Sequence, residues 1–146
     1  MKKKLFLTLL ILAFVLVLVG IGGYLYVFRK APADLSKART DFRVEAPALF
    51  EAFEKDEKAA SARYVGAVLE VRGALEGIEQ SEWGQTILTF VDPFFGVTAT
   101  IDSVMSVRQE SWIGSLNRGD TVTVKGRCDG MLTDVRLVKC MLVGER

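Results

Sequence analysis

Histidine is absent from this chain of 146 residues, and cysteine and proline are scarce, with two and three residues. Without histidine, the sequence excludes Ser-His-Asp and Cys-His catalytic sites and lacks the commonest metal ligand of proteins. Cys128 and Cys140 have 11 residues between them and no C-x-x-C spacing, which argues against a zinc cluster. We therefore expect a protein that is not an enzyme and that carries no metal and no cofactor.

Charged side chains are also absent from one long stretch near the N-terminus, Leu5 to Phe28. As a helix, this stretch would reach about 36 Å, which exceeds the roughly 30 Å hydrocarbon core of a bilayer. Lys2, Lys3 and Lys4 precede it and Arg29 and Lys30 follow it, a bias that favours a cytoplasmic N-terminus. We predict that residues 1–30 are a single-pass transmembrane anchor and that the rest lies on the periplasmic or extracytoplasmic side.

A cleaved secretory signal is the alternative to a retained anchor. Ala31-Pro32-Ala33 loosely fits the small-residue pattern of a cleavage site. The apolar stretch is longer than the usual core of a signal peptide, which favours the anchor. Both interpretations place the domain outside the cytoplasm.

The remainder of the chain is acidic. Residues 31–146 hold all 18 acidic residues and 14 of the 19 basic ones, a net charge of −4, although the whole chain carries +1. Domains that bind nucleic acid usually carry a basic footprint. The composition therefore disfavours a nucleic-acid partner, while a local basic patch stays open.

A polar linker and a short helical region are expected before the main domain. We interpret residues 31–44 as a linker and residues 45–146 as the domain. Pro47 suits the first turn of a helix, and Asp56 is placed to end that helix and cap a second one. The apolar side chains recur at helical spacing and predict an amphipathic helix that packs on the core: Leu49, Phe53, Ala60 and Tyr64.

Beyond this helix the hydrophobic period changes to two, which indicates strands. Five strands are predicted, at about 65–78 (bent at Gly73), 86–91, 97–102, 121–128 and 134–142, with a short helix within 103–116. Five strands with a helical insert after the third match the OB-fold barrel, and an antiparallel sandwich is the alternative. The predicted class is mainly β: a five-stranded OB-fold barrel preceded by an N-terminal transmembrane helix and a short amphipathic helix.

Turn glycines, a capping acid and alternating valines form short motifs between Arg39 and Val143. The motifs are Thr40-Asp41-Phe42, Phe53-Glu54-Lys55-Asp56-Glu57, Tyr64-Val65-Gly66, Glu70-Val71-Arg72-Gly73, the run from Gly119-Asp120 to Gly126, Cys128-Asp129-Gly130, and Asp134-Val135 followed by Cys140. On these residues the chain resembles the tRNA-anti-like family of OB-fold proteins, found largely in bacteria behind a membrane anchor or signal. The resemblance implies an OB-fold and no particular activity.

These features favour a non-catalytic binding or interaction module with an unidentified protein or glycan ligand. The alternative is binding of single-stranded nucleic acid, or of a tRNA-like ligand, by the barrel. The candidate ligand-binding residues are Trp83, Phe94, Phe95, Arg127 and Arg136. The structural interpretation of the same aromatics is that Trp83 is a half-buried cover of its loop and that Phe94 and Phe95 cap a barrel end.

The two cysteines are expected to be buried thiols. Cys128 shares strand parity with Val122 and Val124 and so points inward. A hairpin turning near Met131 would put Cys140 closer to Val122 than to Cys128, beyond the reach of a disulfide. A Cys128–Cys140 disulfide is the alternative, because the compartment outside the membrane is oxidising. The sequence determines neither the ligand nor the oligomeric state.

Overall fold

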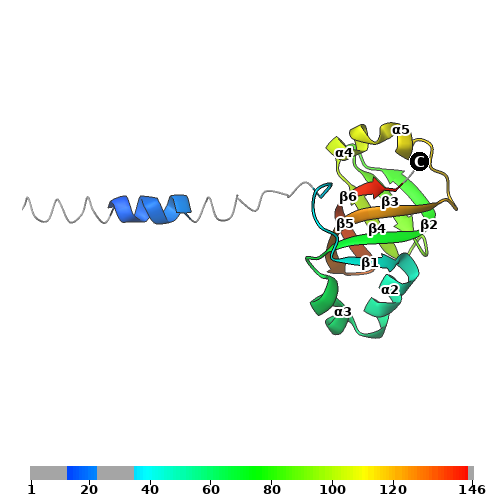
Figure 1. The fold of residues 1–146 in the computed structure, drawn as a ribbon, viewed down its shortest axis with the longest axis horizontal. Coiled ribbons are helices and arrows are strands. Elements are labelled where there is room, and N and C mark those ends of the chain that lie inside the picture. Colours follow the sequence, from blue (N-terminus) through cyan, green and yellow to red (C-terminus); the bar gives the residue numbers. More distant parts are fainter. Residues whose placement is uncertain (1–12, 23–34, 145–146) are drawn as a thin grey trace, which may run out of the picture. The chain divides into compact units, whose positions relative to one another are not determined.

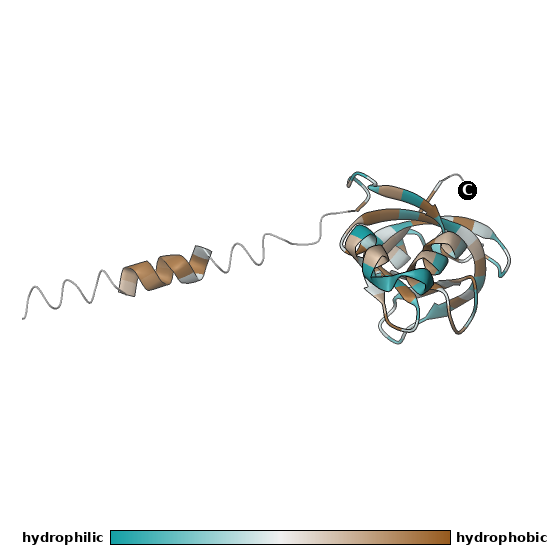
Figure 2. Ribbon diagram, turned by 90° about the horizontal axis from the view of Figure 1, so that it is seen from below, coloured by the Kyte–Doolittle hydropathy of each residue, from teal (hydrophilic) through white to brown (hydrophobic). Residues whose placement is uncertain are grey.

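The computed structural model describes residues 13–22 and 35–144. The chain divides into two units, Met1–Ala33 and Asp34–Arg146. In the first unit, residues 13–22 form a helix of mostly apolar, exposed side chains (Figure 2). The rest of the predicted anchor, Leu5 to Phe28, lies outside the described residues. Within 13–22 and 35–144, no helix combines the length and the apolar character needed to cross a bilayer.

The second unit contains six strands and four helices within residues 35–144 (Figure 1). In chain order they are β1 (Phe42–Glu45), α2 (Ala46–Lys55), α3 (Glu57–Tyr64), β2 (Val68–Gln80), β3 (Thr86–Phe90), β4 (Val97–Ile101), α4 (Ser103–Arg108), α5 (Glu110–Ile113), β5 (Thr121–Met131) and β6 (Val135–Val143).

Five of the strands close into a barrel in the order β2-β3-β4-β6-β5, with β5 pairing back to β2. β4 and β6 run parallel, and the other barrel pairs are antiparallel. The predicted OB-type barrel is confirmed, and the sandwich alternative is wrong. β2 pairs with β5 as far as Ala74 and with β3 from Leu75. Just before this exchange, a Cβ on Gly73 would lie 2.9 Å from the Cβ of Ala46, so glycine allows the close approach.

The segment predicted to be a linker, residues 31–44, belongs in part to the domain. Phe42–Glu45 form β1, which pairs in parallel with β2 from Leu69 to Arg72. Leu35 is buried, and the Phe42 ring meets that of Tyr64 edge-on at 5.3 Å. β1 covers an edge of β2 that would otherwise expose unpaired backbone groups. A strand of four residues is too short to show its alternation in the sequence.

The helix pairs lie at opposite ends of the barrel, with α2 and α3 at one end and α4 and α5 at the other (Figure 1). On α2, Phe53 is 1% exposed, which confirms its predicted place in the core. The Asp56 carboxylate accepts a hydrogen bond from the backbone N–H of Ala59 at 3.0 Å and caps α3, as predicted.

The single helix expected within 103–116 is divided into α4 and α5 at Gln109. The Gln109 side-chain amide donates to the carbonyl oxygen of Leu142 and accepts from its N–H, both at 2.9 Å. The helical insert is therefore fastened to the last strand of the barrel.

Both cysteines are free thiols that lie 1% exposed in the core. Cys128 faces Leu137 in the pairing of β5 with β6, so it does not meet Cys140 across the hairpin. Cys140 packs instead over Gly126, where a Cβ would lie 2.3 Å from its Sγ atom. Burial raises the pKa of both thiols.

Candidate functional site

The outward side of β3 and β4 forms a surface that we call the β3–β4 face. The two strands pair from Thr86–Ile101 to Phe90–Val97, and alternate side chains turn into the barrel. The remaining side chains are half-buried and mostly carry hydroxyl groups: Ile87, Thr89, Thr98 and Thr100. OB-folds commonly bind ligands on this face and on the loops beside it. We therefore take it as the starting point of the site.

The loop between β3 and β4 holds two phenylalanine rings out in solvent. Oδ1 of Asp92 accepts hydrogen bonds from the backbone N–H groups of Phe94 at 2.8 Å and Phe95 at 3.1 Å. The carbonyl of Gly96 accepts from the N–H of Val135 at 2.9 Å, which ties the loop to β6. Phe94 is 79% exposed and Phe95 is 59% exposed. The interpretation that they cap the barrel is therefore wrong.

The same loop begins with a strained residue. Val91 has φ +78°, in the left-handed region that β-branched side chains rarely adopt. Such a conformation costs about 1–3 kcal/mol and is concentrated at functional sites. The strained backbone of Val91 and the two hydrogen bonds of Asp92 together indicate that the loop has one defined conformation.

An open pocket of about 510 Å³ lies at the same end of the barrel as this loop, because β4 enters its pairing with β6 at Val97 and Val135. Its lining is formed by Ser61, Val65, Asp129, Gly130, Met131, Leu132 and Arg136. Leu132 is 82% exposed and Val65 is 47% exposed. We call the group formed by Val65, Phe94, Phe95, Met131 and Leu132 the apolar end.

Trp83 lies apart from the apolar end. It occupies the turn between β2 and β3, so the length of β3 separates it from Phe94. The hydroxyl of Ser81 accepts from the N–H of Gln85 at 3.2 Å and closes this turn. Trp83 is 82% exposed, so the expectation of a half-buried loop cover is wrong.

The two candidate arginines lie at different places on the barrel. Arg136 stands beside Thr98 in the pairing of β4 with β6 and lines the pocket. Arg127 lies on β5 between Val68 of β2 and Val138 of β6, away from β3 and β4. The structure thus brings Phe94, Phe95 and Arg136 to one end, leaves Trp83 at the other, and places Arg127 on another side of the barrel.

Leu132 and Val65 are functional candidates that the sequence alone does not single out. Leu132 stands in the turn between β5 and β6, where polar residues are usual, so an apolar residue there is the available signal. Val65 follows α3, and the strand predicted at 65–78 includes it, although it precedes β2 and is exposed.

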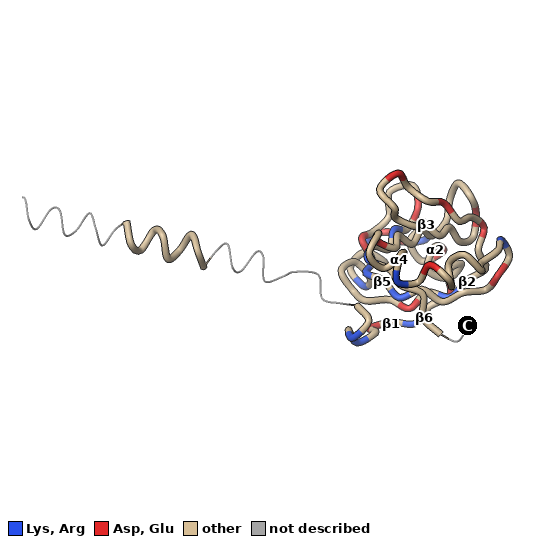
Figure 3. The backbone as a smooth tube through the Cα atoms, turned by 90° about the horizontal axis from the view of Figure 1, so that it is seen from above, with Lys and Arg blue, Asp and Glu red and all other residues tan. Residues whose placement is uncertain are grey.

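The segment of the chain that contains β3 and β4 is acidic. Residues 74–107, which include most of β2 and all of β3 and β4, contain no Lys or Arg and five acidic residues: Glu76, Glu79, Glu82, Asp92 and Asp102. Figure 3 shows Asp and Glu marking the loops on the β3 side of the domain. These acidic residues disfavour a polyanion at this face, although Glu76 is paired with Arg118 and Arg136 stands beside Thr98.

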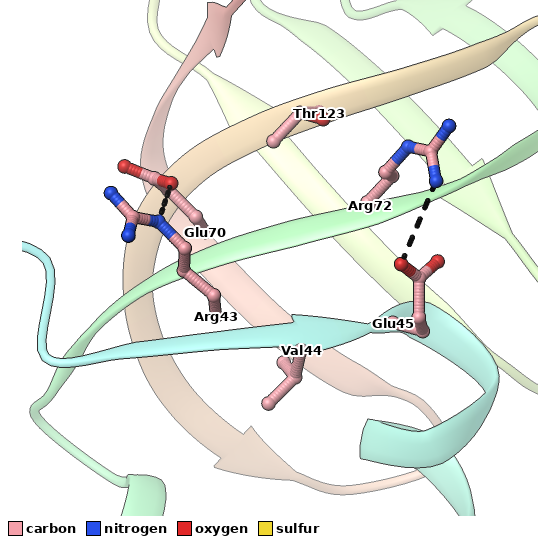
Figure 4. Close-up of a pocket in the computed structure, with 6 residues that line it drawn as sticks. All are labelled: Arg43, Val44, Glu45, Glu70, Arg72 and Thr123. Carbon is pink, nitrogen blue, oxygen red and sulfur yellow. Dashed lines mark hydrogen bonds and ion pairs between the residues drawn. The ribbon is translucent and has the colours of Figure 1, made fainter.

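A second pocket, of about 320 Å³, is lined mostly by charged residues and lies on the outward side of β1, β2 and β5 (Figure 4). Nε of Arg43 donates to Glu70 at 2.7 Å, and Arg72 approaches Glu45 at 3.9 Å. The hydroxyl of Thr40 also donates to Glu70, at 2.6 Å. The hydrogen bond from Thr40, followed by that from Arg43, lowers the pKa of the Glu70 carboxyl.

Chemically, these surfaces present apolar rings, hydroxyls and fixed charges. Within residues 13–22 and 35–144, no group of three or more His, Cys, Asp or Glu side chains is placed to hold a metal ion. The arrangement is suited to recognition of a surface or a ligand.

One similar solved structure supports the barrel, and two others show a weaker likeness. A "putative nucleic acid-binding lipoprotein" from Klebsiella pneumoniae is 21% identical with a TM-score of 0.56, over 77% of this chain and 99% of that chain. The S. pombe Stn1-ten1 complex is 17% identical with a TM-score of 0.42, over 53% of this chain and 59% of that one. Asparaginyl-tRNA synthetase from Entamoeba histolytica is 12% identical with a TM-score of 0.42, over 56% and 21%. At 21% identity, the likeness to the Klebsiella protein concerns the fold alone.

A search of curated proteins gives no significant match. A model of the tRNA_anti-like family matches residues 1–142. This match agrees with the resemblance seen in the turn motifs and with the closed barrel. The chain therefore belongs to the tRNA_anti-like family.

Proposed function

We propose that this protein is a binding module, held on the extracytoplasmic side of a membrane, that recognises a protein partner through Phe94 and Phe95. The observation that carries the proposal is the exposure of both rings, 79% and 59%, on a loop that Asp92 fixes with two hydrogen bonds. Aromatic anchors dominate protein interfaces, and anchors fixed before binding lose little conformational entropy on binding. Exposed rings of this size have no evident role in folding.

The neighbouring residues suggest what the partner looks like. The open pocket beside Leu132 can receive an apolar side chain, while the acidic surroundings of the β3–β4 face favour a neutral or basic partner surface. A glycan could use the threonine hydroxyls of this face, but Leu132 and Val65 offer it no hydrogen bonds. A protein partner fits the apolar end better.

Membrane attachment is the second part of the proposal. It is supported by the uncharged stretch from Leu5 to Phe28 and by its flanking lysines and arginine. The family match begins at residue 1 and so includes this stretch. The similar Klebsiella protein is described as a lipoprotein, which agrees with a domain held at a membrane.

The proposed role is binding rather than catalysis. The chain contains no histidine, and burial raises the pKa of both cysteine thiols, so neither is a ready nucleophile.

Binding of single-stranded nucleic acid is the second candidate. It is favoured by the description of the Klebsiella protein as nucleic acid-binding and by the three exposed aromatics. It is opposed by the absence of Lys and Arg from residues 74–107. We expect a single-stranded oligonucleotide to bind weakly or not at all at physiological salt; tight, salt-sensitive binding would reverse the ranking.

Photo-crosslinking in the producing cells tests the main proposal. A photoreactive phenylalanine replaces Phe95 in the full-length protein, and a matched probe replaces Ala48, an exposed residue of α2. We expect a discrete protein adduct from position 95 only, with the protein in the membrane fraction. Equal adducts from both positions, or an adduct with nucleic acid, would contradict the protein-binding role, and recovery of the intact chain in the soluble fraction would contradict the anchor.

A further inference from the structure

A second surface of the barrel has the opposite charge to the β3–β4 face. It is formed by residues 35–45, which include β1, by the first part of β2, and by the adjoining parts of β5 and β6. We call it the β1 surface. β5 pairs with β2 and β6, whereas β3 and β4 pair with each other, so the β1 surface and the β3–β4 face lie on different sides of the barrel.

The segments that form the β1 surface carry a net positive charge, although Lys125 among them is buried. The segments 35–45, 68–73, 121–127 and 138–143 hold three acidic residues and seven basic ones: Lys37, Arg39, Arg43, Arg72, Lys125, Arg127 and Lys139. Their net charge is +4, against −5 for residues 74–107. Figure 3 shows Lys and Arg along the side of the domain where β1 lies. The domain as a whole is therefore polarised, although its net charge is negative.

The cations of the β1 surface are not all neutralised by ion pairs. Arg43 is paired closely with Glu70, whereas Arg72 reaches Glu45 only at 3.9 Å across the second pocket (Figure 4). Within the described part of the chain, Arg127 and Lys139 are exposed and make no ion pair. Arg127 and Lys139 are therefore free to meet an external anion, and Arg72 is held only by its 3.9 Å ion pair with Glu45.

The chain enters the domain at this same surface. Leu35 is buried, and the Nζ of Lys125 donates a hydrogen bond to the carbonyl of Ala38, which fixes the entering segment against β5. Only six residues, 29–34, separate Leu35 from the apolar stretch. Their extended reach is at most about 25 Å.

We propose that the β1 surface rests on anionic phospholipid headgroups, with Arg72, Arg127 and Lys139 as the contacting cations. The inference rests on the proposed membrane anchor, which would hold this surface close to the bilayer. Each cation near an anionic membrane strengthens binding by about fivefold, and the short tether raises the effective concentration further. When the β1 surface is docked in this way, the acidic β3–β4 face is turned away from the lipid.

The test uses the domain, residues 34–146, without the anchor. The whole hydrophobic core lies within this unit, and circular dichroism and a melting curve verify its folding. Sedimentation with vesicles of phosphatidylglycerol and phosphatidylcholine is compared with vesicles of phosphatidylcholine alone. We expect weak binding to the anionic vesicles only, lost at high salt.

The charge-reversed variant Arg72→Glu/Arg127→Glu should bind the anionic vesicles at least tenfold more weakly. The matched control is Lys58→Glu/Arg108→Glu, which reverses two exposed cations on α3 and α4 and makes the same change in net charge. Equal losses in both variants, or no preference for anionic vesicles, would overturn the inference. Because the anchor is missing from this assay, failure here leaves the fractionation and crosslinking tests of the proposed function unaffected.

Discussion

Glu70 fastens the beginning of the domain to the barrel. Its carboxylate accepts hydrogen bonds from Thr40 and Arg43, both in the segment that leads into and forms β1. The side chain is 19% exposed, so these bonds are partly shielded from water. A charged Glu70 therefore links residues distant in sequence.

The pKa of Glu70 predicts how this link responds to acid. The pKa is lower in the folded protein than the ordinary value of 4.5. The carboxylate therefore stabilises the fold fully above that value, and its contribution disappears as the pH falls through the folded pKa. Urea unfolding of Glu70→Gln should show a loss of stability at neutral pH that shrinks below pH 4.5. A loss that is constant with pH would contradict this, and Glu51→Gln on the exposed side of α2 should change the free energy of unfolding by less than about 0.5 kcal/mol.

Gly126 and Cys140 make a second prediction at the residue scale. A Cβ on Gly126 would lie 2.3 Å from the Sγ of Cys140 and 3.3 Å from the carbonyl of Val138. Gly126→Ala should destabilise the protein by about 1–3 kcal/mol, because the core is already filled. In the Cys140→Ala background the same change should cost clearly less, as measured by a double-mutant cycle in denaturant. Strictly additive losses would show that the two residues do not compete for this space.

At the scale of elements, helix α2 joins the barrel through its buried face. Phe53 is 1% exposed and packs 6.2 Å from Tyr64, ring centre to ring centre. Phe53→Ala should lower the free energy of unfolding by about 3–5 kcal/mol, since it empties a core site. Phe50→Ala, one turn earlier on the half-buried side, should cost less. Equal losses from both would mean that α2 does not pack in this orientation.

The elements that the sequence predicts are those whose pattern is long enough to repeat. In the five barrel strands, apolar and polar residues alternate along the sequence, so the strands can be predicted. The position of Asp56 marks the division between α2 and α3. β1 is not predictable, because its four residues include two exposed charges and its partner, Leu69 to Arg72, is reached through parallel pairing. The break at Gln109 depends on a contact with Leu142, which no local pattern encodes.

The candidate site is predictable only in part, because contacts distant in sequence also decide where its side chains lie. Residue type identifies Phe94 and Phe95, but their exposure depends on the backbone shape that Asp92 and Val91 impose on the loop. Arg127 is close to the last hairpin in sequence, and for this reason the sequence predicts that it joins Phe94 and Phe95. In the closed barrel, however, β5 pairs with β2, so Arg127 lies on the β1 surface.

At the scale of the whole domain, the two charged surfaces and the apolar end make the surface of the domain uneven in charge and polarity. The basic β1 surface lies where the chain enters, and the acidic β3–β4 face lies on another side of the barrel. A domain tethered through residue 35 and attracted to anionic lipid through the β1 surface would turn the β3–β4 face away from the lipid. This polarity would explain how an acidic domain can lie close to an anionic membrane.

The central claim is that Phe94 and Phe95 are exposed for binding and contribute little to folding. The most direct measurement is the crosslinking yield from a photoreactive probe at Leu132, compared between the wild type and Phe94→Ser/Phe95→Ser, with unfolding curves of both proteins as the control. We predict that the adduct is lost while the free energy of unfolding changes by less than about 1 kcal/mol, since both rings are exposed. An undiminished adduct, or a loss of several kcal/mol in stability, would contradict the account.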